Sequence, residues 1–78
     1  MDLLKRITLD PLVCHGKPTI RGMRYPVESI LEYLSAGDSI QDILIEFKDL
    51  EEADILACLA YATKVIKTNS IVIKDIAA

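Results

Sequence analysis

Apolar residues recur at helical spacing from position 27 onward. The first stripe lies at i, i+3, i+4 and i+7, and its members are Val27, Ile30, Leu31 and Leu34. Acidic residues such as Glu28 fall on the opposite side of the same turns. Pro26 suits the first turn of a helix, and Gly37 is a natural C-terminal stop. The pattern predicts an amphipathic helix over residues 27–36.

A second helix is predicted over residues 40–48. Ser39 is a good N-cap, and Asp42, three residues later, completes an approximate capping box. The apolar stripe repeats the spacing of the first helix, with Ile40, Ile43, Leu44 and Phe47. The connector Gly37–Ser39 between the two helices is short enough for a helix-turn-helix arrangement.

A third and longer helix is predicted over residues 50–67, with Asp49 and Glu52 as its capping pair. Its central stripe is expected to consist of Ile55, Leu59, Ala62 and Ile66. A separate face of small residues would let another helix approach closely. That dimer or packing face is expected to comprise Ala53, Ala57, Ala60 and Leu56.

The segments on either side of the helices read differently. Residues 1–26 combine β-type alternation in "RITLD" with turn signals at Asp10-Pro11, Gly16-Lys17-Pro18 and Arg21-Gly22. Residues 70–78 form a short tail that suits either a strand or a helical extension. The fold class expected is therefore mainly α, a single three-helix, helix-turn-helix-like domain with a short N-terminal β/turn segment.

Length and composition favour self-association. The chain has 78 residues, of which 51% are apolar and only 5% aromatic. A single small core is marginally stabilising, so this apolar excess predicts a homodimer. No apolar run reaches the length of a membrane span, and the start "MDLLKR" lacks the hydrophobic centre of a signal peptide. We expect a cytoplasmic protein with no membrane partner.

The net charge of −3 hides a strong asymmetry along the chain. Residues 1–24 hold five bases against two acids, whereas residues 25–63 hold one base against nine acids. The basic stretch of residues 15–26, called here the basic arm, carries Lys17, Arg21 and Arg24 and no acid. One interpretation is a solvated turn whose cations pair with the acidic helices. The other is an anion-recognition segment, because arginine clamps carboxylates and phosphates with paired hydrogen bonds.

Catalytic and metal-binding chemistry find little support in the sequence. Cys14 and His15 are adjacent, which on an extended segment points them to opposite sides, and no third group completes a nucleophilic site. One histidine and two remote cysteines do not make a metal site. Neither an enzyme, nor a cofactor, nor a small-molecule substrate is expected.

The acids of residues 28–54 are expected to form a solvated helix face. They also argue against DNA recognition by the third helix, because its start "DLEEAD" would bring carboxylates against phosphates.

Taken together, residues 6–62 resemble a small prokaryotic family labelled domain of unknown function 433. The resemblance rests on Asp10-Pro11, Gly16-Lys17-Pro18, Ile20-Arg21-Gly22, Arg24, Pro26-Val27, Ala36-Gly37 and Leu59-Ala60-Tyr61-Ala62. Two positions depart from the family pattern. Glu51 stands where a small hydroxyl cap is usual, which shifts capping to Asp49, and His15 stands where a second glycine is common.

The resemblance implies a helix-turn-helix-related, dimeric antitoxin of a type II toxin–antitoxin pair, with a PIN-like nuclease as partner. An arginine of the basic arm would enter the carboxylate-rich nuclease site, and reversing the charge of Arg21 and Arg24 would abolish partner capture with the fold intact. The alternative is a stand-alone dimeric DNA-binding regulator that uses the same cations on operator phosphates.

Overall fold

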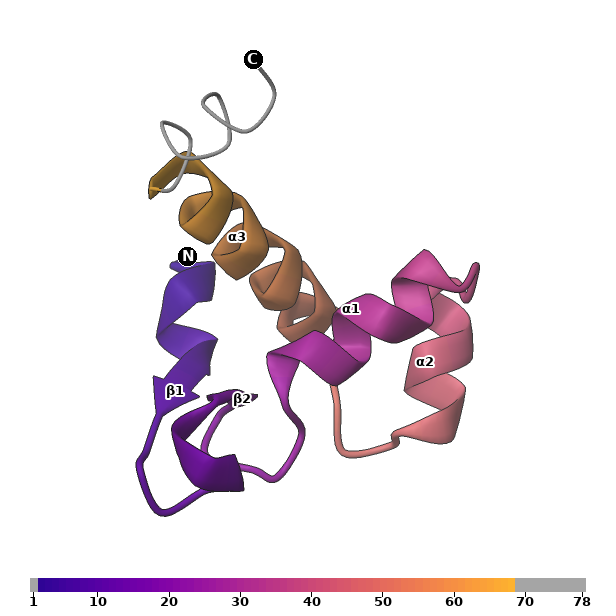
Figure 1. Cartoon of the computed structure of the whole chain (residues 1–78). Coiled ribbons are helices and arrows are strands. Elements are labelled where there is room, and N and C mark those ends of the chain that lie inside the picture. Colours follow the sequence, from indigo (N-terminus) through magenta and orange to yellow (C-terminus); the bar gives the residue numbers. More distant parts are fainter. Residues whose placement is uncertain (1, 69–78) are drawn as a thin grey trace.

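The computed structural model describes residues 2–68 and confirms a mainly α fold with a short N-terminal β segment. Three helices, α1 (Val27–Ser35), α2 (Ile40–Glu46) and α3 (Glu52–Thr68), follow a two-stranded antiparallel sheet (Figure 1). The prediction for residues 70–78 falls outside the described residues.

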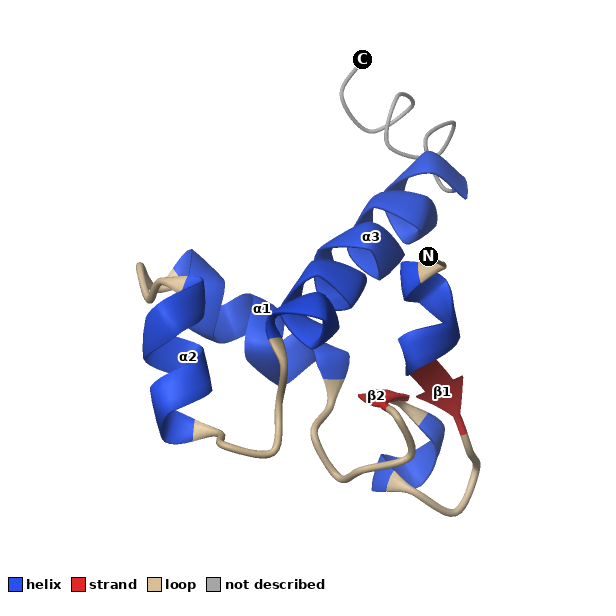
Figure 2. Cartoon of the chain, turned by 180° about the vertical axis from the view of Figure 1, so that it is seen from behind, coloured by secondary structure: helices blue, strands red, loops and turns tan. Residues whose placement is uncertain are grey.

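The N-terminal segment contains more regular structure than the turn signals indicated. Strands β1 (Ile7–Leu9) and β2 (Pro18–Ile20) pair so that Ile7 faces Ile20 and Leu9 faces Pro18. Two short 3-10 helices accompany them, η1 (Leu3–Arg6) and η2 (Cys14–Gly16). Viewed from both sides, η1 runs along α3, while α1 and α2 lie on the other side of that helix (Figures 1 and 2).

The predicted helix boundaries hold to within one or two residues, and local geometry explains the differences. Gly37, with φ of 103°, ends α1 as expected, and the N–H of Asp38 donates to the carbonyl of Tyr33. Ser39 and Asp42 form a complete capping box at the start of α2. Phe47 leaves helical geometry, so α2 stops at Glu46.

The core lies where the three helices meet β2. Ile20 and Ile55 have no exposed surface, and Ile30 and Ile43 keep 1% and 2%. These side chains come from β2 and all three helices, and the cluster is completed by Val27, Leu50 and Cys58. The two core residues that α3 contributes, Ile55 and Cys58, both lie in the N-terminal half of that helix. The last turns of α3 extend past this core (Figure 1).

Candidate functional site

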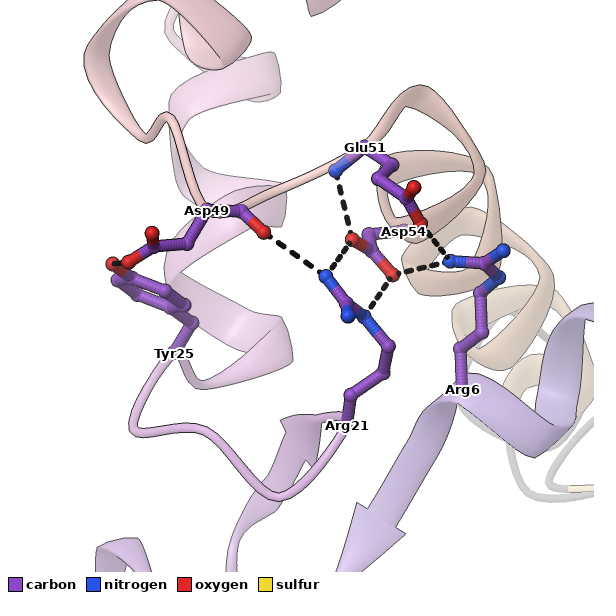
Figure 3. A network of polar contacts seen from close by, with 6 residues as sticks. All are labelled: Arg6, Arg21, Tyr25, Asp49, Glu51 and Asp54. Carbon is purple, nitrogen blue, oxygen red and sulfur yellow. Dashed lines mark hydrogen bonds and ion pairs between the residues drawn. The ribbon is translucent and has the colours of Figure 1, made fainter.

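The most heavily bonded polar group in residues 2–68 is the carboxylate of Asp54, which has no exposed surface. Its Oδ1 accepts hydrogen bonds from Arg6 Nη1 and Arg21 Nε, each 3.0 Å long. Its Oδ2 accepts from Arg21 Nη2 at 2.9 Å and from the backbone N–H of Glu51 at 2.8 Å (Figure 3). Two guanidinium groups and one peptide N–H thus surround a single buried carboxylate, which satisfies its lone pairs.

Secondary bonds extend this arrangement to neighbouring segments. Arg6 also pairs with Glu51 at 2.8 Å, and Arg21 Nη2 donates to the carbonyl oxygen of Asp49 at 3.0 Å. We call Arg6, Arg21, Asp49, Glu51 and Asp54 the Asp54 cluster. It ties η1, the turn after β2 and the start of α3 to one another (Figure 3).

The local backbone explains why Arg21 reaches α3. Arg21 and Gly22 have φ of 46° and 71°, which places both in the left-handed region. The turn is closed by the N–H of Met23 bonding to the carbonyl of Ile20, and the N–H of Arg21 donates to the carbonyl of Arg6. The left-handed conformation is unusual for a non-glycine residue. Here it directs the Arg21 side chain toward Asp54.

The capping of α3 differs from the prediction. The carboxylate of Asp54, at the third helical position, accepts from the N–H of Glu51, which is one half of a capping box. Asp49 does not cap the helix, because its Oδ2 accepts the hydroxyl of Tyr25 at 3.1 Å. The expectation that the acids of residues 28–54 form a solvated face is likewise wrong for Asp54.

Electrostatics within the cluster favour the ionised carboxylate. Burial raises the pKa of Asp54, but hydrogen bonds from Arg21, the Glu51 backbone and Arg6 outweigh burial and lower that pKa below its ordinary value of 3.8. The hydrogen bonds that Arg6 donates to Glu51 and Asp54, and those that Arg21 donates to Asp54, raise the pKa of both arginines. Asp54 and its two arginine partners are therefore held in their charged forms at neutral pH.

The lowered pKa of Asp54 predicts a loss of stability in acid. A group whose pKa is depressed by folding stabilises the protein fully above its ordinary pKa, and loses that contribution as the pH falls through the folded value. We expect the urea midpoint of the wild-type chain to be level between about pH 5 and 7 and to fall below about pH 4.

Two variants measured over the same pH range give this prediction its control. Asp54→Asn cannot titrate, so its urea midpoint should start lower and change less in acid. Asp42→Asn removes a second carboxylate whose pKa is lowered, chiefly by the Ser39 backbone N–H, but at an exposed site. An acid response that persists in Asp54→Asn and disappears in Asp42→Asn would contradict the assignment.

The structure separates the three predicted anion-binding cations. Arg21 belongs to the Asp54 cluster, where its charge is paired with a buried carboxylate, although its side chain keeps 39% exposure. Lys17 pairs with Glu28 at 2.6 Å on the surface, where both side chains stay more than half exposed. Arg24 is exposed, and none of its atoms forms a hydrogen bond or ion pair with residues 2–68. Within the basic arm, only Arg24 therefore combines exposure with a charge that residues 2–68 leave uncompensated.

Arg24 borders a shallow hollow of about 430 Å³ whose other lining residues are Pro11, Leu12, Cys14 and His15. We call these five residues the Leu12–Arg24 face. Leu12 is 92% exposed, although leucine usually avoids water. Cys14 and His15 have φ of 49° and 58°, so they lie in a left-handed turn and not on the extended segment that the sequence predicted. The positive φ at His15 is a conformation that glycine adopts more readily than other residues.

Two observations bear on metal binding and on the reactivity of the buried thiol. Within residues 2–68, no three histidine, cysteine or acidic side chains are grouped so that they would hold a metal ion. Burial raises the pKa of Cys58 to about 12, which keeps that thiol protonated and unreactive.

The predicted packing face of α3 is partly internal. Ala57 has no exposed surface, so it packs inside the chain and cannot meet a second copy. Ala53 and Ala60 are half-buried, and η1 is the element that packs most extensively on α3. Only Leu56, at 40% exposure, retains substantial apolar surface among the four residues. Ala57 therefore serves the fold of the single chain, whereas Leu56 stays exposed on the surface.

Sequence reasoning missed Asp54 as the partner of Arg21, and Arg6 as the second cation bonded to the same carboxylate. The helical spacing does indicate that Asp54 is buried, because it lies four residues before the apolar Cys58, on the side of the helix that also carries Ile55. An acid on the buried side of a helix requires a cation, and the excess of bases in residues 1–24 supplies two.

One further finding concerns the length of the helices: among residues 2–68, none is both long and apolar enough to cross a bilayer.

Comparison with known proteins places these observations in context. The family model described as "Protein of unknown function (DUF433)" matches residues 7–62. A solved structure of a DUF433 member protein from Anabaena variabilis ATCC 29413 superposes with a TM-score of 0.70 at 27% sequence identity. The match covers 94% of this chain and 69% of that one. A search of curated proteins finds no match.

Proposed function

This chain belongs to the DUF433 family, whose function is unknown, so we infer its function from its own surface residues. We propose that it is a non-enzymatic, antitoxin-like protein. It neutralises a PIN-like nuclease by presenting Arg24 and Leu12 to the carboxylates of the nuclease site. The observation that carries this proposal is the exposed, uncompensated charge of Arg24 beside the 92% exposed Leu12.

The exposed Arg24 is of the residue type found at protein-binding hot spots, and Leu12 supplies apolar surface beside it. Arginine is enriched among residues that dominate interface energetics, and a neighbouring apolar contact excludes water from the ion pair. Nuclease sites that hold divalent cations gather several carboxylates, which a guanidinium pairs with in bidentate fashion. Arg24 would thus replace the metal as the counter-charge of that site.

In this proposal only Arg24 of the basic arm contacts the partner, and the other residues of the arm hold Arg24 in place. Arg21, three residues before Arg24, bonds to Asp54 and so fixes the turn to α3. Pro18 and Pro26 flank the turn and limit the entropy that is lost on docking. Lys17 is paired with Glu28 at the surface, so its charge is balanced within the chain.

DNA binding is the weaker reading of the same cations. The start of α3, which would be the reading helix of a helix-turn-helix protein, carries Asp49, Glu51, Glu52 and Asp54 close together. Arg6 and Arg21 compensate two of these four charges, so the surface there does not become positive. Phosphate binding requires a net excess of cations.

Affinity capture from native host lysate, treated with nuclease to remove nucleic-acid bridges, tests the proposal. The wild-type chain is expected to retain a protein of the PIN-like nuclease class, identified by mass spectrometry, and to inhibit that nuclease after purification. Arg24→Glu and Leu12→Asp should each lower capture at least tenfold, because each places a carboxylate against the acidic site.

Lys48→Glu is the matched control for Arg24→Glu. It makes the same charge change at an exposed lysine that lies in the loop after α2. Equal loss of capture in both variants would indicate a non-specific charge effect and contradict the proposal. Binding to duplex DNA that weakens steeply with salt and depends on Arg24, without capture of a nuclease, would establish the regulator instead.

A further inference from the structure

Besides the Leu12–Arg24 face, the surface has an apolar groove between the start of α1 and the last turns of α3. Its volume is about 400 Å³, and Val27 and Leu31 of α1 face Tyr61, Ala62 and Ile66 of α3 across it. The ion pair between Lys17 and Glu28 lies at its rim. An open, apolar groove of this kind is a binding surface, because exposed apolar area is costly in water.

A stripe of exposed apolar residues runs along α3 beside this groove. Leu56, Leu59 and Ile66 are exposed by 40%, 40% and 58%. Their spacing of three and then seven residues places them on one helix face, with Thr63 between them, in the pattern of a helix–helix seam. Ile66 belongs to both features, since it also lines the groove. The same helix thus provides projecting side chains and one wall of a groove.

The charges of the two helices are complementary. The charged residues of α1 are Glu28 and Glu32, without a base. After Asp54, the charged residues of α3 are Lys64 and Lys67, without an acid. A helix that carried the α3 charges and lay across the groove would meet the acids of α1.

We propose that this occupant is the α3 helix of a second copy of the chain. A two-fold axis would place the Leu56–Ile66 stripe of each copy in the groove of the other, with Lys67 of each copy near Glu32 of its partner. Such an interface is self-complementary, because one surface supplies both the projecting residues and the groove. The inference is independent of the proposed antitoxin role, which uses the Leu12–Arg24 face.

Sedimentation equilibrium across the micromolar range tests the pairing. The wild-type chain is expected to be a dimer, and Ile66→Glu should weaken the dimer by roughly 100-fold or more, because it buries an unpaired carboxylate. Ile45→Glu is the matched control, since Ile45 is a 71% exposed isoleucine on α2, and it should leave the dimer unchanged. A monomeric wild-type chain, or a dimer that survives Ile66→Glu, would overturn the proposal.

A charge exchange distinguishes a second copy from any other occupant. Glu32→Lys and Lys67→Glu should each weaken self-association, since each brings like charges together at both halves of the interface. Mixing the two variants should restore pairing, because both contacts of the mixed dimer are then attractive. If each variant loses its dimer but the mixture stays monomeric, α3 does not lie across α1 of the second copy. If deletion of residues 69–78 is what creates the dimer, the tail and not a second copy fills the groove in the intact chain.

Discussion

Replacing Asp54 with alanine is expected to lower the free energy of unfolding by about 3 kcal/mol or more. The change leaves the guanidinium of Arg21 without its carboxylate and deprives the N–H of Glu51 of its acceptor. Breaking a buried ion pair costs about 3–5 kcal/mol, and the low end applies here because both arginines reach solvent. A small domain has only about 5–15 kcal/mol in total, so we expect the variant to remain folded in water at room temperature but to unfold at a much lower urea concentration.

Urea unfolding followed by circular dichroism measures this effect. Glu52→Ala is the control, because Glu52 is an exposed acid in the first turn of the same helix. Its loss should change the free energy of unfolding by only about 0.5 kcal/mol, the usual scale for a charge near a helix N-terminus. If the two alanine variants unfold at the same urea concentration, Asp54 does not hold the segments together.

Arg21→Glu is expected to abolish cooperative folding. It replaces a bidentate partner of Asp54 with a second carboxylate, and two like charges next to a buried site cannot both stay ionised and paired. Arg21→Lys should give an intermediate loss, because an ammonium group donates to the carboxylate but cannot reproduce the planar fork. Thermal unfolding of the three proteins should rank them as wild type, Arg21→Lys and Arg21→Glu.

Arg24→Glu is the internal control for this series. It makes the same charge reversal three residues later, at a side chain with no hydrogen bond or ion pair to residues 2–68, and should keep the wild-type melting temperature. A wild-type melting temperature in Arg21→Glu would show that the Asp54 cluster is dispensable. The sequence had assigned both arginines to partner binding. Because Arg21 is bonded to Asp54, we expect the Arg21 variant to report on folding and the Arg24 variant to report on capture.

The amphipathic pattern predicted α1 and α2 well because both helices are short and bury a single side. The stripe that contains Ile30 packs on the core, and the capping box at Ser39 forms as its sequence indicates. Such features depend on residues within one or two turns of each other. Local sequence therefore carries nearly all the information that they require.

The stripe of α3 was predicted less well, because two apolar faces compete on that helix. Ile55 and Cys58 are fully buried, whereas Leu59 and Ile66 of the expected central stripe are 40% and 58% exposed. Hydrophobicity alone does not tell a face that packs within the chain from one that remains open. The decision depends on where β2, η1 and α1 end, which is tertiary information.

The candidate site was predicted in part for a similar reason. Arg24 and Lys17 lie at the surface as the sequence suggested, while Arg21 is bound to a residue 33 positions away. A cation before a glycine turn looks the same in sequence whether its partner is external or internal. The buried acid at position 54 decided between these readings, and it was hidden in the run "DLEEAD".

Asp54 also constrains how this sequence can change over generations. Positions 6, 21 and 54 are far apart in the chain but share one carboxylate, so the effect of substituting one depends on the other two. A neutral residue at position 54 would remove the carboxylate to which Arg6 and Arg21 both bond. A neutral residue at position 21 would leave the buried carboxylate of Asp54 with one cation instead of two. Substitutions at the three positions are therefore coupled. A change at one of them passes through a less stable intermediate until the other two have changed as well.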